Sequence, residues 1–284
     1  GKRLRPMLVL LCAGPDAGPA ALRAAAAVEL VHMATLVHDD VLDAAPLRRG
    51  VPTIYAQAGA GRATALGDLL FSRAFAALGS DGDGARRQVA LLADAADALA
   101  RGELAQRRDA YDVRVTAERY LYRCSLKTAR LFECACLVGR AGGEDVGESA
   151  DREDPAADHL RTFGREIGLA FQLLDDVLDV AGPPERTGKA RGTDLLDGTV
   201  TLPLIIARER DRELEGLDLR ALDADGAEEA CERIAATGAL EEVRADARER
   251  VAEAKRALRE SPRIDAGQRQ LLTLVADGVV ERYA

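Results

Sequence analysis

The pentapeptide Asp-Asp-Val-Leu-Asp occurs twice in this chain, at residues 39–43 and 175–179. Each copy lies at the end of an apolar, helix-favouring run, VELVHMATLVHDDVLD in the first case and IGLAFQLLDDVLDV in the second. Because positions i and i+4 of a helix lie one above the other, the first and last carboxylates of each copy should project together, with the second beside them. Like charges at the negative C-terminal end of a helix cost stability unless cations neutralise them.

A solvent-exposed acidic turn would explain one such cluster, but it is a poor explanation for two identical ones in apolar sequence. All six groups are hard oxygen ligands with no thiolate set nearby, which disfavours zinc and favours magnesium. Magnesium takes few carboxylates, keeps water and bridges to substrate phosphates. An EF-hand is excluded because its ligands alternate along a loop. The two pentapeptides therefore predict a magnesium site that works with a phosphorylated ligand.

Basic residues near these clusters could hold such a ligand. The chain carries a formal net charge of −9, so local groups of cations stand out, although a lone surface lysine usually serves only solubility. Arginine grips phosphate oxygens bidentately and lysine acts as a point charge. Together with the aspartates, these residues suggest a diphosphate site: Lys2, Arg3, Arg5, Arg48, Arg49, Lys127 and Lys189.

The elements that must position these residues are helices. Alanine is abundant, aromatic residues make up 4% of the chain, and period-two alternation is hard to find, so composition favours an all-α fold. A length of 284 residues suits one large core, and we expect a single domain over 1–284. Glycine and proline divide the chain into the predicted helices 3–13, 19–42, 60–79, 85–109, 116–140, 155–180, 200–210, 225–259 (broken near Gly238) and 265–282.

Several classes of protein are disfavoured. An acidic chain is a poor candidate for general nucleic-acid binding, because neutralising phosphates needs an excess of lysine and arginine. We find no run of eighteen apolar residues and expect no membrane span. The five cysteines lack the spacing of a zinc site or a disulfide framework, and we expect reduced core cysteines in a cytoplasmic protein.

These motifs resemble those of the trans-isoprenyl (polyprenyl) diphosphate synthases over nearly the whole chain. The matching segments are GKRLRP at the start, HDDVLD followed by PLRRG, KTA at 127–129, FQLLDDVLD at 171–179, GK at 188–189 and TLP at 201–203. The resemblance implies long antiparallel helices around a deep central cavity, a homodimer, and head-to-tail condensation of isopentenyl diphosphate with an allylic diphosphate. It also implies magnesium, with three ions per active site.

The resemblance assigns a role to each matching residue. Asp39, Asp43, Asp175 and Asp179 would bind metal, with Asp40 and Asp176 supporting catalysis together with Lys127. Isopentenyl diphosphate would be held by Lys2, Arg5, His32 and Arg49. The allylic diphosphate would be held by Arg48, Lys127, Thr128, Gln172 and Lys189.

His32 has support from spacing as well, because it lies seven residues before Asp39, about two turns away on the same face. A lone histidine on an apolar helix is more often a core residue, and we favour the functional interpretation here.

Product length should depend on the cavity beneath the first aspartate cluster. Ala34 and Thr35 lie about 6 to 7.5 Å below Asp39 at a rise of about 1.5 Å per residue. Family members that make fifteen- or twenty-carbon products often place an aromatic side chain there. The small residues predict a product of about thirty to fifty carbons, with Phe71 and Phe75 as a deeper floor or simply as core residues.

Three alternatives remain open. A farnesyl or geranylgeranyl diphosphate synthase shares all these motifs. The second alternative is a class I terpene cyclase, which generally carries an Asn/Ser/Glu metal motif in place of the second DDVLD. The third is a non-catalytic partner subunit, which would have damaged aspartate motifs. The chain departs from the family at Thr199, where lysine is frequent, and it begins at its first basic motif, ahead of which the resemblance implies a further helix.

Overall fold

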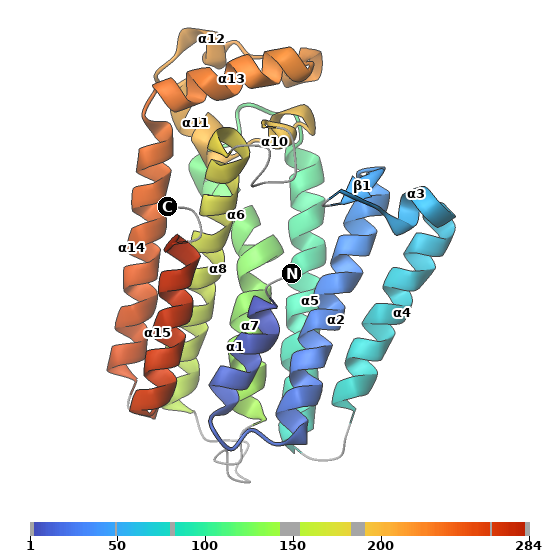
Figure 1. The fold of residues 1–284 in the computed structure, drawn as a ribbon, viewed down its shortest axis with the longest axis vertical. Helices are drawn as coiled ribbons and strands as arrows, with labels where there is room; N and C mark the ends of the chain where they lie inside the picture. The colour runs from blue at the N-terminus through green and yellow to red at the C-terminus, as the bar shows by residue number, and fades with distance from the viewer. Residues whose placement is uncertain are drawn as a thin grey trace.

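The computed structural model describes residues 3–48, 50–79, 83–142, 154–182, 191–261 and 263–281. Long helices run side by side along the molecule, and a smaller group of helices lies across one end (Figure 1). The predicted all-α bundle is confirmed. The first half of the bundle contains α1 (Leu4–Ala13), α2 (Pro19–Leu42), α3 (Ile54–Ala58), α4 (Ala60–Leu78), α5 (Asp83–Asp109), α6 (Ala117–Cys124) and α7 (Arg130–Ala141).

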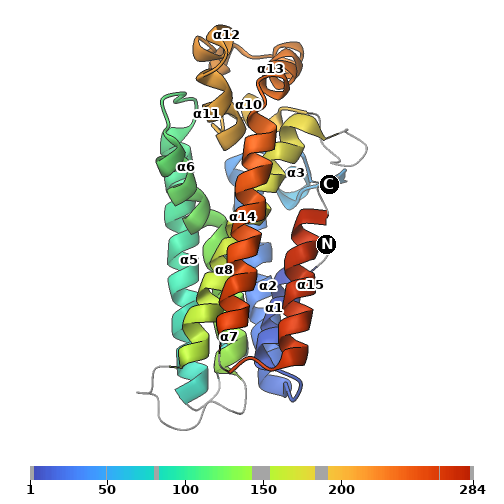
Figure 2. The same ribbon diagram turned by 90° about the vertical axis from the view of Figure 1, so that its left-hand side faces the viewer.

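The second half contains α8, which lies among the other long helices, and then the helices of the crossing end and two final long helices (Figure 2). Their bounds are α8 (Pro155–Ala181), α10 (Thr193–Leu196), α11 (Leu202–Arg208), α12 (Arg212–Glu215), a 3-10 turn η2 (Leu219–Ala221), α13 (Ala224–Ala236), α14 (Ala239–Glu260) and α15 (Ala266–Glu281). The predicted break near Gly238 separates α13 from α14.

Two aspects of the local structure differ from the sequence prediction. The loop 43–53 contains a two-stranded antiparallel hairpin, β1 (Leu47–Arg48) and β2 (Val51–Pro52), in which Arg48 pairs with Val51. The helix expected over 116–140 is interrupted by a π-helical segment, η1 (Ser125–Ala129), between α6 and α7. A π segment inside a helix often marks a functional site, and this one contains the predicted site residues Lys127 and Thr128.

The apolar faces of these helices meet in one hydrophobic core cluster that draws residues from α1, α2, α7, α8, α14 and α15 among others. α2 is long and apolar enough to cross a membrane by length and composition alone, contrary to the expectation of no such segment. Its Ala24, Ala27, Val28 and Val31 are fully buried in the bundle, as in the core helix of a globular protein. All five cysteines are free and buried, as expected.

Two glycines let neighbouring helices approach the π segment closely. A Cβ on Gly102 of α5 would lie 2.6 Å from the backbone nitrogen of Lys127, and a Cβ on Gly168 of α8 would lie 2.6 Å from the Cα of Ala129. Both contacts involve backbone or a short side chain, which cannot swing away. The absence of a side chain at these two positions therefore sets the distance of α5 and α8 from η1.

α2, α5 and α8 run in the same direction, so their C-terminal ends lie at the same end of the bundle (Figure 1). The two Asp-Asp-Val-Leu-Asp segments lie at the C-terminal ends of α2 and α8. The fold thus brings both acidic segments to one end of the molecule.

We expect Gly102→Ala to destabilise the protein by about 1 to 3 kcal/mol, because the added methyl group would push α5 away from η1. The matched control is Gly61→Ala in α4, where a Cβ meets nothing within 4 Å. The control should be neutral or stabilising by up to about 1 kcal/mol, since alanine is the better helix former. Denaturant unfolding measures both, and equal effects would contradict the close contact at Gly102.

Candidate active site

The first acidic cluster includes Asp39, a half-buried carboxylate near the end of α2. Burial raises the pKa of Asp39 to about 6, and the nearby charges of Glu103 and Asp43 add to this effect. The positive charges of Lys127 and Arg48 oppose the increase without cancelling it. Burial therefore has a larger effect on the pKa of Asp39 than the two cations beside it.

Asp40 points away from that position. It is only 6% exposed, and one of its oxygens accepts a hydrogen bond of 2.7 Å from Nε of Arg48 on β1. The ion pair ties the hairpin to α2. Adjacent helix positions differ by about 100°, which explains why Asp39 and Asp40 have different environments.

In the second cluster, too, one carboxylate is buried and the others lie nearer the surface. The buried ones, Asp40 and Asp176, are the inner carboxylates of the two clusters. Asp176 is 2% exposed, and it accepts hydrogen bonds from the hydroxyl of Tyr120 and from Nε2 of Gln172, the latter at 2.8 Å. The Thr128 hydroxyl donates in turn to Oε1 of Gln172 at 2.7 Å. Burial raises the pKa of Asp176 to about 7, although the hydrogen bonds from Tyr120 and Gln172 oppose this increase. Thr128 and Gln172 therefore belong to a network around the inner carboxylate.

The other two aspartates of the second cluster lie toward the surface. Asp175 is exposed and lines the cavity described below. One oxygen of Asp179 accepts a hydrogen bond of 3.1 Å from the backbone nitrogen of Asp194, which fixes the start of α10. In this structure Asp175 is thus the member of the cluster that faces a ligand-sized space.

A row of alternating charges crosses the site between α2 and η1. Lys127 forms an ion pair with Glu103 on α5, and the other oxygen of Glu103 accepts a hydrogen bond of 2.9 Å from Nε of Arg107. Nη2 of Arg107 donates to Oδ1 of Asp43 at 2.6 Å. Burial alone would raise the pKa of Glu103, but the two cations outweigh burial and hold that pKa below its usual value. This row places the Lys127 ammonium near the first cluster.

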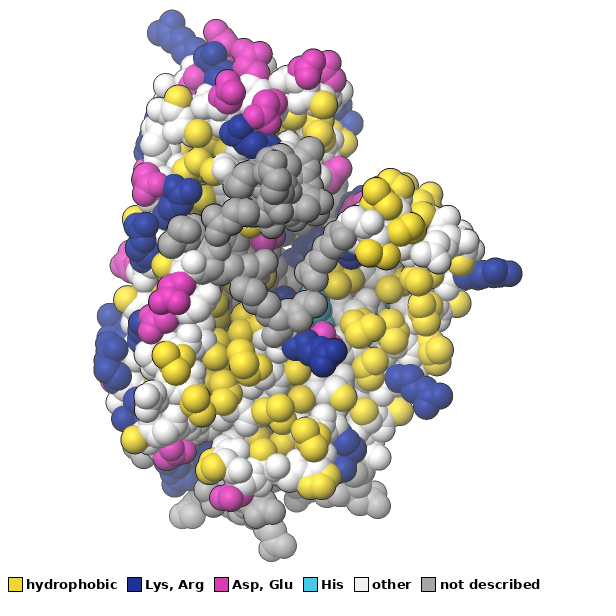
Figure 3. All heavy atoms as spheres, in the orientation of Figure 1, with side chains coloured by type: hydrophobic (Ala, Val, Ile, Leu, Met, Phe, Trp, Pro, Cys, Tyr) yellow, Lys and Arg dark blue, Asp and Glu magenta, His cyan; other side chains and the backbone are white. Residues whose placement is uncertain are grey.

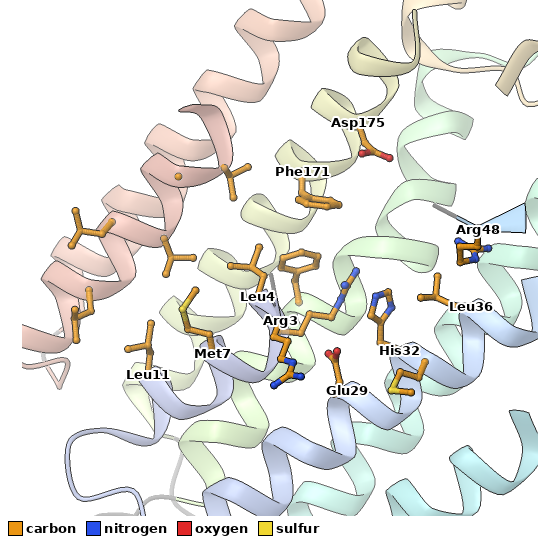
Figure 4. A pocket seen from close by; sticks show the side chains of 18 residues that line it. Arg3, Leu4, Met7, Leu11, Glu29, His32, Leu36, Arg48, Phe171 and Asp175 are labelled. Atoms are coloured by element: carbon orange, nitrogen blue, oxygen red, sulfur yellow. The ribbon is translucent and has the colours of Figure 1, made fainter. Parts of the chain in front are cut away.

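A cavity of about 780 Å³ lies between α1, α2, α7, α8 and α15. Figure 4 shows Asp175 and Arg48 on opposite walls at one end, His32 and Glu29 further along, and Met7 and Leu11 of α1 at the other end. One end of this cavity is therefore charged and the other is apolar. That combination suits an amphiphilic ligand with an anionic head.

Arg5 supplies a half-buried cation to the same cavity. Its guanidinium carbon lies 4.4 Å from the centre of the Phe132 ring, and its buried Nε has no hydrogen-bond partner within the described part of the chain. Burial lowers the pKa of Arg5 to about 10, while the charge of Glu29 raises it. A desolvated guanidinium with unused donor capacity is suited to an anionic ligand.

The donor chemistry fits a divalent cation, although the protein side chains alone do not enclose one. Among the described residues, no three His, Cys, Asp or Glu side chains are close enough together to hold a metal ion. Magnesium needs only one or two carboxylates when substrate phosphates and water complete its shell. Asp39 on α2, Asp43 at its C-terminal cap and Asp175 on α8 are the carboxylates that could serve it.

Three predicted site residues, Lys2, Arg49 and Lys189, lie outside the described residues. Of the predicted chain-length residues, Ala34 is fully buried, and Thr35 donates its hydroxyl to the backbone oxygen of His32 at 2.8 Å. Phe71 and Phe75 of α4 are half-buried against the core cluster, and Phe71 contacts His38 at a ring separation of 5.7 Å.

The sequence analysis missed four residues that take part in the site: Glu29, Glu103, Arg107 and Tyr120. The spacing of Glu103 and Arg107 at i and i+4 indicates a shared helix face. That spacing gives no sign of their partners Asp43 and Lys127. Tyr120 carries no comparable signal, because its role depends on the contact of α6 with α8.

These features define a helical bundle in which two aspartate-bearing helices end on the same side, beside a cavity lined by cationic and apolar side chains. The family model for Polyprenyl synthetase matches residues 1–236. The chain belongs to the polyprenyl synthetase family.

Three similar proteins support this assignment. The heptaprenyl diphosphate synthase component 2 of Geobacillus stearothermophilus is 40% identical over 214 residues, which cover 75% of this chain and 64% of that relative. The short chain isoprenyl diphosphate synthase of Methanothermobacter thermautotrophicus is 37% identical over 292 residues, covering 99% of this chain and 86% of the relative. A crystal structure of a polyprenyl synthase from Caulobacter crescentus, complexed with calcium and isoprenyl diphosphate, superimposes with a TM-score of 0.87 at 35% identity, covering 100% of this chain and 86% of that one.

The raised pKa of Asp39 predicts a pH-dependent stability difference. The folded carboxyl binds its proton more tightly than the unfolded one, with a pKa of about 6 against 3.8, so its contribution to stability falls as the pH rises between these values. Without metal, Asp39→Asn should therefore be more stable than the wild type above pH 6, by about 1 to 3 kcal/mol, and this gain should vanish near pH 4.

Thermal unfolding from pH 4 to 8 in the presence of a chelator measures this effect. Asp97→Asn, which changes a carboxylate exposed on α5, is the control and should show no such trend. A stability difference for Asp39→Asn that does not change with pH would contradict the assignment.

Proposed function

We propose that this protein is a magnesium-dependent prenyltransferase that joins isopentenyl diphosphate to an allylic diphosphate by head-to-tail addition, giving a trans-polyprenyl diphosphate. The observation that carries the proposal is one cavity whose lining combines Arg5, His32 and Arg48 with Asp175 and an apolar wall. Its relatives support the same chemistry, since the Caulobacter protein was crystallised with calcium and isoprenyl diphosphate.

The allylic diphosphate would lie between the two acidic clusters. Magnesium bound by Asp39, Asp43 and Asp175, with Asp179 beside them, would stabilise the negative charge of the departing diphosphate. Lys127 would add a cation from η1, while Glu103 holds its ammonium in place. Arg48 would contribute a further cation at the same end of the cavity.

The inner carboxylates have a different task in this proposal. Asp40 fixes Arg48, and Asp176 with Gln172 and Thr128 fixes the turn that carries Asp175. Both are held by protein partners in the structure. They would act on the reaction by keeping the outer groups in position.

Isopentenyl diphosphate would bind at Arg5 and His32, with Lys2 and Arg49 as further candidates from the sequence. The Arg5 guanidinium is already desolvated, so a diphosphate oxygen would give its Nε the missing partner. The isopentenyl double bond would then attack the allylic cation. The product of this attack would lose a proton, and the base that we propose for its removal is the released diphosphate. Holding two substrates in one orientation supplies much of the remaining rate enhancement.

A homodimer is the proposed assembly, and the outer face of α3, α4 and the hairpin is the proposed contact. Figure 3 shows hydrophobic side chains gathered over α3 and α4. Leu69 of α4 is 51% exposed, and Leu47 and Val51 of the hairpin are exposed as well. Such a patch is typical of an interaction surface.

The five free, buried cysteines are consistent with a reducing compartment, and we propose the cytoplasm.

We propose a long-chain product of about thirty to fifty carbons. Small side chains at Ala34 and Thr35 support this length, and one relative is a heptaprenyl diphosphate synthase component. The second candidate is a short-chain synthase, because a relative of similar identity carries that name. A terpene cyclase is disfavoured, since the second metal motif here is DDVLD.

Asp39→Ala and Asp175→Ala should each lower turnover by at least about a hundredfold, because each removes a carboxylate that holds metal against the leaving group. Incorporation of labelled isopentenyl diphosphate, with magnesium and several allylic primers, measures this loss. Asp97→Ala on the exposed face of α5 should retain activity. Turnover like that of the wild type in both site variants would refute the proposed metal site.

Ala34→Phe should shorten the product, because its ring would fill space below the first aspartate cluster. Chromatography of the products measures chain length. Since Ala34 is fully buried, Thr35→Phe at a half-buried position provides a second test should the first variant fold poorly. Leu22→Phe, at a position of α2 that is 59% exposed and does not line the cavity, is the control. An unchanged product pattern in folded Ala34→Phe and Thr35→Phe would place the limit elsewhere.

A further inference from the structure

Arg107 is a cation at the first acidic cluster that the motifs do not assign to the reaction. It lies in the last turn of α5, where one guanidinium nitrogen contacts Asp43 and another contacts Glu103. The contact with Asp43, at 2.6 Å, connects α5 to the end of α2 across 64 residues of sequence, and the contact with Glu103, at 2.9 Å, lies within α5. Arg107 is therefore the positive partner of a carboxylate that our proposed function assigns to the metal.

Arg107 and a metal ion would compete for the charge of the same carboxylate. Oδ1 of Asp43 is the acceptor of the 2.6 Å hydrogen bond, and a divalent cation bound at Asp43 would lie close to the Arg107 guanidinium. Two positive charges that close to one carboxylate repel each other. Metal binding at Asp43 must therefore weaken or break the contact with Arg107.

The structure also shows how the pair could separate. Arg107 and Asp43 are 41% and 46% exposed, so water can solvate both groups when they part. Glu103 is 15% exposed and pairs with Lys127 as well, so it would keep hold of Nε of Arg107. The guanidinium would then stay at the rim of the site with its contact to Asp43 released.

We propose that Arg107 is a positioning residue that neutralises Asp43 before metal binds and that sets the metal concentration the enzyme needs. This inference rests on the proposed function, because it requires Asp43 to be a metal ligand. Arg107 itself lies outside both aspartate motifs, which occupy residues 39–43 and 175–179. A partly exposed ion pair is modest in strength, which limits the competition to a few-fold change in affinity.

The test is a titration of the protein with Mn²⁺, an ion that suits carboxylate ligands. Electron paramagnetic resonance measures the concentration of free Mn²⁺ and so gives the affinity. With a fixed amount of inorganic diphosphate to supply phosphate ligands, Arg107→Gln should bind Mn²⁺ about 1.5- to 5-fold more tightly than the wild type. Arg107→Lys, which keeps the charge, should bind like the wild type or fall between the two. The difference should shrink at high ionic strength, because salt screens a partly exposed pair.

The matched control is Arg101→Gln, which breaks an ion pair with Asp97 on the exposed face of the same helix. Its Mn²⁺ affinity should equal that of the wild type. In an Asp43→Asn background, Arg107→Gln should have no further effect, because the competing carboxylate is gone.

Two results would overturn the inference in distinguishable ways. If Asp43→Asn weakens Mn²⁺ binding but Arg107→Gln leaves it unchanged, the metal site stands and the competition by Arg107 is wrong. If Asp39→Asn and Asp43→Asn both bind Mn²⁺ like the wild type, the metal site of the proposed function fails, and the inference fails with it.

Discussion

The repulsion among carboxylates gathered at the ends of two helices is the constraint on which the rest of this site depends. Each acidic segment adds three negative charges to a helix end that is already negative. The structure meets this cost in two ways. Asp40 and Asp176 are buried with protein partners, whereas Asp39 and Asp175 keep access to the region where a cation and an anionic ligand could bind. A one-residue step along the helix separates the two roles.

The protein's own cations compensate the negative charge of Asp39 only in part. Lys127 and Arg48 do not bring the pKa of Asp39 back to its ordinary value, because burial outweighs them. Glu103 lies between Lys127 and Arg107 and pairs with both, so its negative charge separates these two cations.

Close backbone packing decides which of these charges can meet. Gly102 lets α5 lie against η1, and this contact brings Glu103 within reach of Lys127. The π segment changes the helical register between α6 and α7, so that Thr128 faces Gln172 on α8 while Tyr120 reaches Asp176. The electrostatics of the site are thus a consequence of how three helices pack.

The sequence by itself determined the helical class, most helix boundaries and the nature of the chemistry. Helix 19–42 was predicted at its observed bounds, since apolar runs and punctuation by glycine and proline are local signals. The repeated aspartate motif, which carried the family resemblance, is also a local signal.

Only the tertiary structure decided which carboxylates turn inward, that Arg107 contacts Asp43, and that the Arg5 guanidinium lies over the Phe132 ring. The hairpin at 47–52 and the π segment likewise escaped prediction, because their stability comes from contacts with other elements. Partners 64 residues apart, as in the pair of Arg107 and Asp43, leave no periodic trace in the sequence. Their contact arises from the packing of α5 beside α2, which depends on the whole bundle.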